Sequence, residues 1–165
     1  MIFTFGNYKL DVDVEKTKEY YKVAKLINED CSCNGCLNYI EALAFFPQEV
    51  TSFFTQLGVE MKKPTEVYAY CANADETLFY GGWYHVCATM IHGESPVVST
   101  GQNQVCFDET KTFLITDDFK IYFCKECDLL DNNFPLPAVQ LEIIADIPWV
   151  LAEGHEYPKD MSRKK

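Results

Sequence analysis

Eight cysteines occur in the 165 residues of the chain, and three of them, Cys31, Cys33 and Cys36, lie within six positions. A further pair, Cys124 and Cys127, has the same two-residue spacing that separates Cys33 from Cys36. Two such pairs are typical of a tetrahedral four-cysteine zinc site, because this spacing lets both sulfurs of a pair reach one ion at about 2.3 Å. We therefore predict a structural zinc site formed by Cys33, Cys36, Cys124 and Cys127, with Cys31 as an alternative ligand.

The first cysteine group also permits other interpretations. Zinc could instead be held by Cys31, Cys33 and Cys36 together with a histidine. Alternatively, Cys33 and Cys36 form a dithiol at the start of a helix, where the pKa of the first thiol is lowered and exchange with disulfides is fast. Thioredoxin-like folds place such a pair directly after a strand, whereas a helix is predicted to precede this one. A chain that binds no metal stably is a further alternative.

Aromatic residues of two predicted strands form a second candidate site. Side chains alternate between the two faces of a strand, so Trp83 and His85 share one face, which Tyr68 and Tyr70 extend. We predict that these four residues form an aromatic surface that receives a peptide or a small ligand. The alternative is structural, because such a face is more often covered by a helix than left open. His85 would then be a hydrogen-bonded residue of the sheet.

The elements that must position these residues begin with helices. The helical spacing of apolar residues predicts three helices in the first third of the chain. The first, 14–28, begins after an aspartate whose carboxylate accepts N–H bonds at a helix start. The second, 36–46, follows the cysteine group. The third, 47–57, has Pro47 at its first position and Gly58 as the residue that ends it.

The apolar period changes to two after residue 64, which predicts strands. A hairpin or an edge strand is predicted over 2–12, a strand over 66–71, and a long strand or bent hairpin over 78–92 with a bulge or kink at Gly81-Gly82. The remaining predicted strands are a short one at 104–107, the pair 112–116 and 119–124 joined by a turn at Asp117-Asp118, and 139–144. Helices followed by strands indicate an α+β fold, with three N-terminal helices packed on a mainly antiparallel sheet formed by the C-terminal two-thirds. Residues 1–158 are predicted to form a single domain, and the polar residues 159–165 an unstructured tail.

Composition and charge exclude several classes of protein. Hydrophobic residues make up 48% of the chain and aromatic residues 15%, which excludes general disorder. The net charge of −11 repels phosphate backbones and anionic lipid, so it argues against nucleic-acid and membrane-surface binding. It favours a basic protein partner, or serves solubility alone. No run approaches the roughly 20 apolar residues of a membrane span, and charged residues interrupt the N-terminus before a signal peptide can form. We expect a cytoplasmic protein with reduced thiols.

Several short motifs carry a resemblance to a known family. In chain order they are Cys33-x-x-Cys36-x-Asn38-Tyr39, Phe46-Pro47, Leu57-Gly58, Glu66-Val67-Tyr68, Tyr80-Gly81-Gly82-Trp83-Tyr84-His85 and Gln140-Leu141-Glu142. With these motifs the chain resembles, over residues 31–151, a family of small bacterial proteins that has no established activity. The resemblance implies a bacterial cytoplasmic protein and includes Cys33 and Cys36. Nothing in it extends to the other candidate zinc ligands.

Three functions fit these observations. The chain carries no G-x-S-x-G, no phosphate-binding glycine loop and no H-E-x-x-H, which favours a non-enzymatic protein. The first hypothesis is therefore a cytoplasmic protein that binds a protein partner and contains structural zinc. The first alternative is a thiol-disulfide oxidoreductase with Cys33 as nucleophile and Cys36 as resolving thiol. The second alternative is an acidic inhibitor or immunity-type protein that binds a basic partner by charge complementarity.

Overall fold

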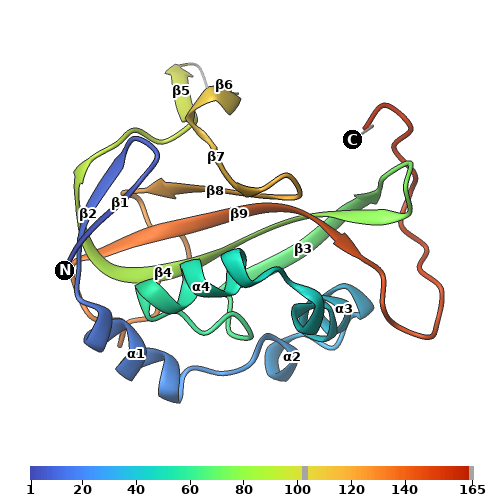
Figure 1. Ribbon diagram of the computed structural model, residues 1–165, viewed down its shortest axis with the longest axis horizontal. Coiled ribbons are helices and arrows are strands. Elements are labelled where there is room, and N and C mark those ends of the chain that lie inside the picture. Colours follow the sequence, from blue (N-terminus) through green and yellow to red (C-terminus); the bar gives the residue numbers. More distant parts are fainter. Residues whose placement is uncertain (102–103, 164–165) are drawn as a thin grey trace.

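A seven-stranded antiparallel sheet forms one layer of the structure, and helices cover one of its faces (Figure 1). The computed structural model describes residues 1–101 and 104–163. The α-helices are α1 (Val14–Val23), α2 (Ile27–Asp30), α3 (Asn34–Ala42) and α4 (Gln48–Leu57), with 3-10 turns at Leu43–Phe45 and Glu109–Lys111. The strands are β1 (Ile2–Phe5), β2 (Tyr8–Val12), β3 (Glu66–Ala72), β4 (Thr77–His92), β5 (Val97–Gly101), β6 (Gln104–Phe107), β7 (Phe113–Thr116), β8 (Phe119–Cys124) and β9 (Ala138–Pro148).

The strand order of the sheet is β1-β2-β4-β9-β8-β7, with β3 paired to β4 outside this path, and β5 and β6 form a separate hairpin. Neighbouring strands in both sheets run antiparallel. The α+β prediction is therefore confirmed. The N-terminal hairpin β1-β2 joins the same sheet, so the sheet is not built by the C-terminal two-thirds alone. Among the described helices, none combines the length and the apolar composition needed to cross a membrane.

Strand β4 is the centre of the sheet because it pairs with neighbours on both edges. One edge pairs with β9 without interruption from Thr77 to Cys87. The other edge pairs first with β3 and then with β2. Side chains of α1 fill the gap between them: the Tyr21 hydroxyl donates to the carbonyl of His85 at 3.0 Å, and Thr17 accepts the Cys87 N–H at 3.0 Å. The backbone groups of β4 thus stay hydrogen-bonded where it has no strand partner.

The sheet curls around α4, so that its two end strands approach each other. The rings of Phe5 in β1 and Phe113 in β7 have centroids 6.4 Å apart, although β1 and β7 are the first and last strands of the order. Phe53 of α4 contacts Phe5 at 5.0 Å from the inner side. The inner face of the sheet therefore encloses the apolar side of α4.

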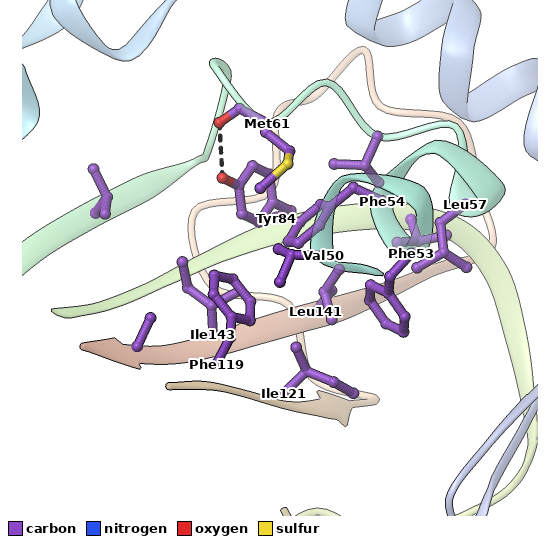
Figure 2. Close-up of a cluster of buried hydrophobic side chains, with 14 of the residues drawn as sticks. Val50, Phe53, Phe54, Leu57, Met61, Tyr84, Phe119, Ile121, Leu141 and Ile143 are labelled. Atoms are coloured by element: carbon purple, nitrogen blue, oxygen red, sulfur yellow. Dashed lines mark hydrogen bonds between the residues drawn. The ribbon is translucent and has the colours of Figure 1, made fainter. Parts of the chain in front are cut away.

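The core lies between α4 and strands β4, β8 and β9 (Figure 2). The buried residues of α4 recur at helical spacing and are Val50, Phe53, Phe54 and Leu57. They face side chains of the sheet that include Phe119, Ile121, Leu141 and Ile143. The helix ends at Gly58, whose φ of 77° is left-handed, as predicted from the sequence.

Two local predictions need correction. The first helix ends at Val23 and not at residue 28, because Ala24 adopts extended backbone with a ψ of 147°. Leu26 then starts the separate turn of α2, with its N–H bonded to the Glu29 carboxylate at 2.7 Å. A bulge or kink was expected at Gly81-Gly82, but no bulge lies there, because both glycines pair in regular register with β3 and β9; the register shift lies on β3, between Ala69 and Cys71.

The end of the described chain lies against β3. A parallel bridge joins Lys159 to Ala72, and Lys159 forms an ion pair with Glu76. The Arg163 guanidinium lies 3.4 Å from the ring centroid of Phe79. Residues 159–163, predicted from composition to be an unstructured tail, thus have defined contacts, and residues 164–165 lie outside the described part of the chain.

Candidate functional site

The first cysteine group lies where α2 ends and α3 begins. Cys31 follows α2 in extended conformation, and Cys33 is the N-cap residue of α3. Cys36, in the first turn of α3, donates its backbone N–H to the Cys33 sulfur at 3.4 Å. Gly35 sits between them because a Cβ at this position would lie 2.5 Å from the hydroxyl oxygen of Tyr157. Because Gly35 has no Cβ, Tyr157 of the C-terminal segment can approach the cysteines.

The three sulfur atoms form a compact group, which we call the cysteine cluster (Cys31, Cys33 and Cys36). All three lie within 4.8 Å of one another, and the Cys31 and Cys33 sulfurs are 3.3 Å apart. Bonds of about 2.3 Å to a tetrahedral ion place sulfurs roughly 3.8 Å apart. The cluster is therefore close to the size that one ion requires, and it could hold a metal ion. Cys36 is buried, Cys31 is half-buried and Cys33 is exposed.

The protein environment separates the acidities of these thiols. Burial acts to raise the pKa of Cys33, but the N–H of Cys36 and the thiol of Cys31 donate to its sulfur and outweigh burial, so the pKa of Cys33 is lowered. Burial raises the pKa of Cys36 strongly, and the adjacent thiols raise it further. Cys33, at the exposed start of a helix, is thus more acidic than Cys36.

The second cysteine pair lies elsewhere in the fold. Cys124 ends β8, and its sulfur is 3.2 Å from the hydroxyl oxygen of Ser95. Cys127 lies in the loop that follows, and burial raises the pKa of both thiols to about 11. Within the described residues, the cysteine cluster is the one group of three or more potential metal ligands that lie within 4.8 Å of one another. The structure therefore does not bring Cys124 and Cys127 to the cluster, nor does a histidine join it.

The four residues predicted to bind a ligand are divided by the fold. The ring centroids of Tyr68 and Tyr70 are 4.7 Å apart, and those of Tyr68 and Trp83 are 6.3 Å apart. His85, in contrast, is 2% exposed. Its Nδ1 is 3.1 Å from the Thr65 hydroxyl, and its ring lies 5.6 Å from that of Phe134. The three larger rings thus remain on the outer side of the sheet, and His85 is covered.

Sequence reasoning missed further residues of this outer surface. Phe79 stacks on Tyr70 with centroids 5.3 Å apart. Tyr122 lies in the strand row of Trp83 but is only 8% exposed, and its ring centroid is 5.7 Å from that of Phe107. We call Tyr68, Tyr70, Phe79, Trp83 and Tyr122 together the aromatic face. The position of Tyr122 between Ile121 and Phe123 was visible in the sequence, but the strand order that places β8 beside β9 and β4 was not.

Glu142 lies within the aromatic face and was also missed. It pairs in register with Trp83 on β4 and with Tyr122 on β8, and its carboxylate accepts a hydrogen bond from the Gln140 amide. Burial raises the pKa of Glu142 to about 7, against the effect of the Gln140 hydrogen bond and with a smaller contribution from the charge of Asp128. One glutamate in an alternating strand looks like an ordinary solvent-facing residue, so no sequence signal marked it.

Comparison with known proteins gives no match for this chain among protein-family models, curated proteins or solved structures. The resemblance to a bacterial family noted from the motifs therefore stays a prediction.

Proposed function

We propose that this protein is a non-enzymatic binding protein whose cysteine cluster holds one zinc ion. A single observation carries the proposal: three sulfur atoms from six consecutive residues lie within 4.8 Å of one another. Three thiolates satisfy three positions of a tetrahedral ion, and the fourth is left for water or for a side chain of a partner. Because Cys33 is exposed, we expect this fourth position to face the surface.

The chemistry of the donors favours zinc over the hard cations. The cluster offers only sulfur, whereas calcium and magnesium take oxygen ligands. Thiolates select zinc, copper(I) and iron–sulfur centres, and zinc needs no redox partner. The backbone N–H of Cys36 points to the Cys33 sulfur and would stabilise its negative charge in a zinc complex.

Zinc would have a structural role at this position. Cys31 belongs to the segment between α2 and α3, whereas Cys36 lies inside α3 with its thiol 3.8 Å from the carbonyl oxygen of Val67 in β3. An ion bound to both would tie this segment to the helix and, through the helix, to the sheet. The surface around it would then be held in one conformation for a partner.

The test is the metal content of protein purified without chelator, together with a count of reactive thiols. We expect about one zinc per chain, and protection of the cluster thiols until a chelator is added. Cys31→Ser and Cys33→Ser should lose the metal, and circular dichroism should show that both variants still fold. Neither position is buried, so these substitutions disturb the core less than a change at Cys36.

Cys106→Ser is the matched control, because this thiol is exposed and lies outside the cluster. It should keep the metal, as should Cys124→Ser and Cys127→Ser. Loss of zinc in the last two variants would support the four-cysteine site of the sequence prediction instead. A wild-type protein that takes up no zinc, even with one equivalent added under reducing conditions, would overturn the proposal.

A second candidate function is thiol-disulfide exchange, which the lowered pKa and the exposure of Cys33 favour. The Cys33 thiolate would attack a substrate disulfide, forming a mixed disulfide and releasing one substrate thiolate, which takes up a proton. Cys36 would then lose its proton and attack the Cys33 sulfur, releasing the second substrate thiol. The substrate disulfide is reduced, the Cys33–Cys36 pair is oxidised, and a thiol reductant restores it.

Metal-free protein distinguishes the two candidates. In the oxidoreductase, one thiol would react with iodoacetamide much faster than the rest at pH 7, and Cys33→Ser would abolish the reduction of a model disulfide. In the zinc protein, Cys33 would be protected in the purified form, and metal-free protein would show no turnover with the disulfide.

A further inference from the structure

The aromatic face contains a carboxylate that forms no ion pair with the described residues of the chain. Glu142 lies on central strand β9, between Trp83 and Tyr122 in register, and the next row places Tyr68 over Gly81. Its side chain is partly buried. Within the described residues, no lysine or arginine forms an ion pair with it, and its hydrogen bond comes from the neutral amide of Gln140.

Such an arrangement is costly for the folded protein. A partly buried carboxylate loses hydration, and proteins usually restore this loss with a paired cation and further hydrogen bonds. The charge of Asp128, which has the same sign, disfavours the ionised form of Glu142 further. The raised pKa of Glu142 expresses this cost. A cation from outside the chain would remove it.

The other end of the aromatic face already holds a cation of the chain itself. The guanidinium of Arg163 lies 3.4 Å from the ring centroid of Phe79, with a terminal nitrogen 3.6 Å from the Asp146 carboxylate. Its Nε donates to the side-chain oxygen of Asn73 at 3.1 Å. An aromatic ring, a carboxylate and a neutral amide thus bind one arginine. Around Glu142 the matching groups are the rings of Trp83 and Tyr68 and the carboxylate itself. The Gln140 amide orients this carboxylate, because its oxygen accepts the Asp128 N–H at 2.7 Å and its nitrogen donates to Glu142.

The two ends are joined by a continuous row of rings. Phe79 stacks on Tyr70 at 5.3 Å with an interplanar angle of 25°, Tyr70 contacts Tyr68 at 4.7 Å, and Tyr68 contacts Trp83 at 6.3 Å. Tyr70 is 54% exposed, so the middle of the row is open to solvent. A basic segment lying along the row would meet rings throughout and the Glu142 carboxylate at its end.

We propose that the aromatic face binds a basic segment of a protein partner, with one arginine side chain placed over Trp83 and Tyr68 and against Glu142. Arginine fits better than lysine, because a planar guanidinium stacks on a ring while its N–H groups bind a carboxylate. The net charge of −11 attracts such a segment and steers its approach. This site is independent of the cysteine cluster and goes beyond the proposed zinc function.

A short peptide of defined sequence tests the proposal with the full-length protein. The probe is acetyl-Gly-Arg-Gly-Arg-Gly-amide, and the readout is the indole N–H signals of protein labelled with ¹⁵N-tryptophan, assigned with Trp83→Phe. The chain has two tryptophans, so Trp149 serves as an internal reference. We expect a saturable shift of the Trp83 signal, whose N–H donates to the Asp128 carbonyl at 3.2 Å, with little change at Trp149.

Two substitutions and two peptides decide the outcome. Glu142→Gln should weaken the apparent affinity at least tenfold, whereas Glu49→Gln, an exposed carboxylate on α4, should leave it unchanged. A peptide with citrulline in place of arginine should not bind, and a lysine peptide should bind more weakly. Equal affinity of wild type and Glu142→Gln, equal binding of the citrulline peptide, or equal binding of the lysine peptide would each overturn the proposal.

Discussion

The cysteine cluster and the aromatic face are built in opposite ways. The cluster comes from six consecutive residues at one helix start, so its geometry follows from local backbone. The aromatic face collects residues from β3, β4, β8 and β9, spread over residues 68–142, and exists only when the sheet is paired. A local site can keep its ligands together in a partly unfolded chain, whereas a distributed site depends on the register of every strand that contributes to it.

The strongest test of whether the two sites are independent measures both zinc binding and peptide binding on a variant of each site. We expect Cys33→Ser to weaken zinc binding by roughly 100-fold, or about 3 kcal/mol, because one of three thiolates is lost. Competition with a chromogenic chelator measures this change. The same variant should bind the arginine peptide as wild type does, and Glu142→Gln should keep its zinc. Loss of both activities in either variant would mean that the two sites are coupled.

The next largest effect is the pH dependence of stability at Glu142. Its pKa is about 7 in the folded protein, above the ordinary value of 4.5, so the folded state holds the proton more tightly than the unfolded state. The contribution of the Glu142 carboxyl group to the free energy of unfolding is therefore complete below pH 4.5 and is lost as the pH rises through 7. Glu142→Gln should raise the free energy of unfolding by about 2 to 3 kcal/mol at pH 8 and by little at pH 5.

Urea unfolding at both pH values measures this difference, with Glu49→Gln as the control for loss of an exposed carboxylate. If the advantage of Glu142→Gln is the same at pH 5 and pH 8, the carboxylate is hydrated and the cost assigned to it is absent.

Substitutions at two adjacent glycines of β4, Gly81 and Gly82, should have different effects on sheet stability and on peptide binding. A Cβ on Gly82 would lie 2.6 Å from the backbone carbonyl oxygen of Glu66, which cannot move without shifting β3. A Cβ on Gly81 would meet the outer end of the Tyr68 ring at 2.9 Å, and this ring can turn away. Gly82→Ala should destabilise the protein by about 2 kcal/mol. Gly81→Ala should cost less than about 1 kcal/mol, yet weaken peptide binding by displacing Tyr68.

Thermal unfolding of both variants measures the stability losses, and titration of the Trp83 indole signal with the arginine peptide measures the change in binding. Equal stability losses would mean that β3 can move away from β4 as easily as the Tyr68 ring can turn.

The smallest expected effect concerns the arginine that the chain supplies itself. Arg163→Ala removes the stacking on Phe79 and the contact with Asp146 and should cost about 0.5 to 1 kcal/mol. For a chain of this length, that loss lowers the midpoint of thermal unfolding by about 1 to 4 °C. Lys125→Ala, which removes an exposed positive charge, should leave the midpoint unchanged. A result for Arg163→Ala that matches Lys125→Ala would show that the aromatic face gains nothing from a guanidinium.

Local patterns in the sequence were sufficient for much of the fold. Gly58 predicted the end of α4, because left-handed backbone at a helix end strongly favours glycine. The pair Asp117-Asp118 predicted the turn between β7 and β8. Ala24 was misassigned because nothing in its own identity opposes helix, and the break depends on the neighbouring turn of α2. The end of α4 is thus decided by the identity of Gly58 itself, whereas the end of α1 is decided by contacts that the following residues make.

The candidate sites follow the same rule. The spacing of Cys31, Cys33 and Cys36 placed them together, since a short loop and one helical turn cannot separate them widely. Spacing alone gave no means of telling whether Cys124, 88 residues after Cys36, would join them (124 − 36 = 88). Glu142 was missed because its neighbours come from other strands, and its unusual environment arises from pairing across the sheet.

The C-terminal segment also has a consequence for self-association. The N–H of Ala72 donates to the carbonyl of Pro158, and the carbonyl of Ala72 accepts from Asp160, both at 2.9 Å, so residues 158–160 cover the end of β3 on the side away from β4. An uncovered strand edge is a template for another chain, and natural proteins protect such edges to avoid aggregation. Residues 158–160 thus protect this end of the β3 edge, and a variant truncated before residue 158 would expose it to pairing with a second molecule.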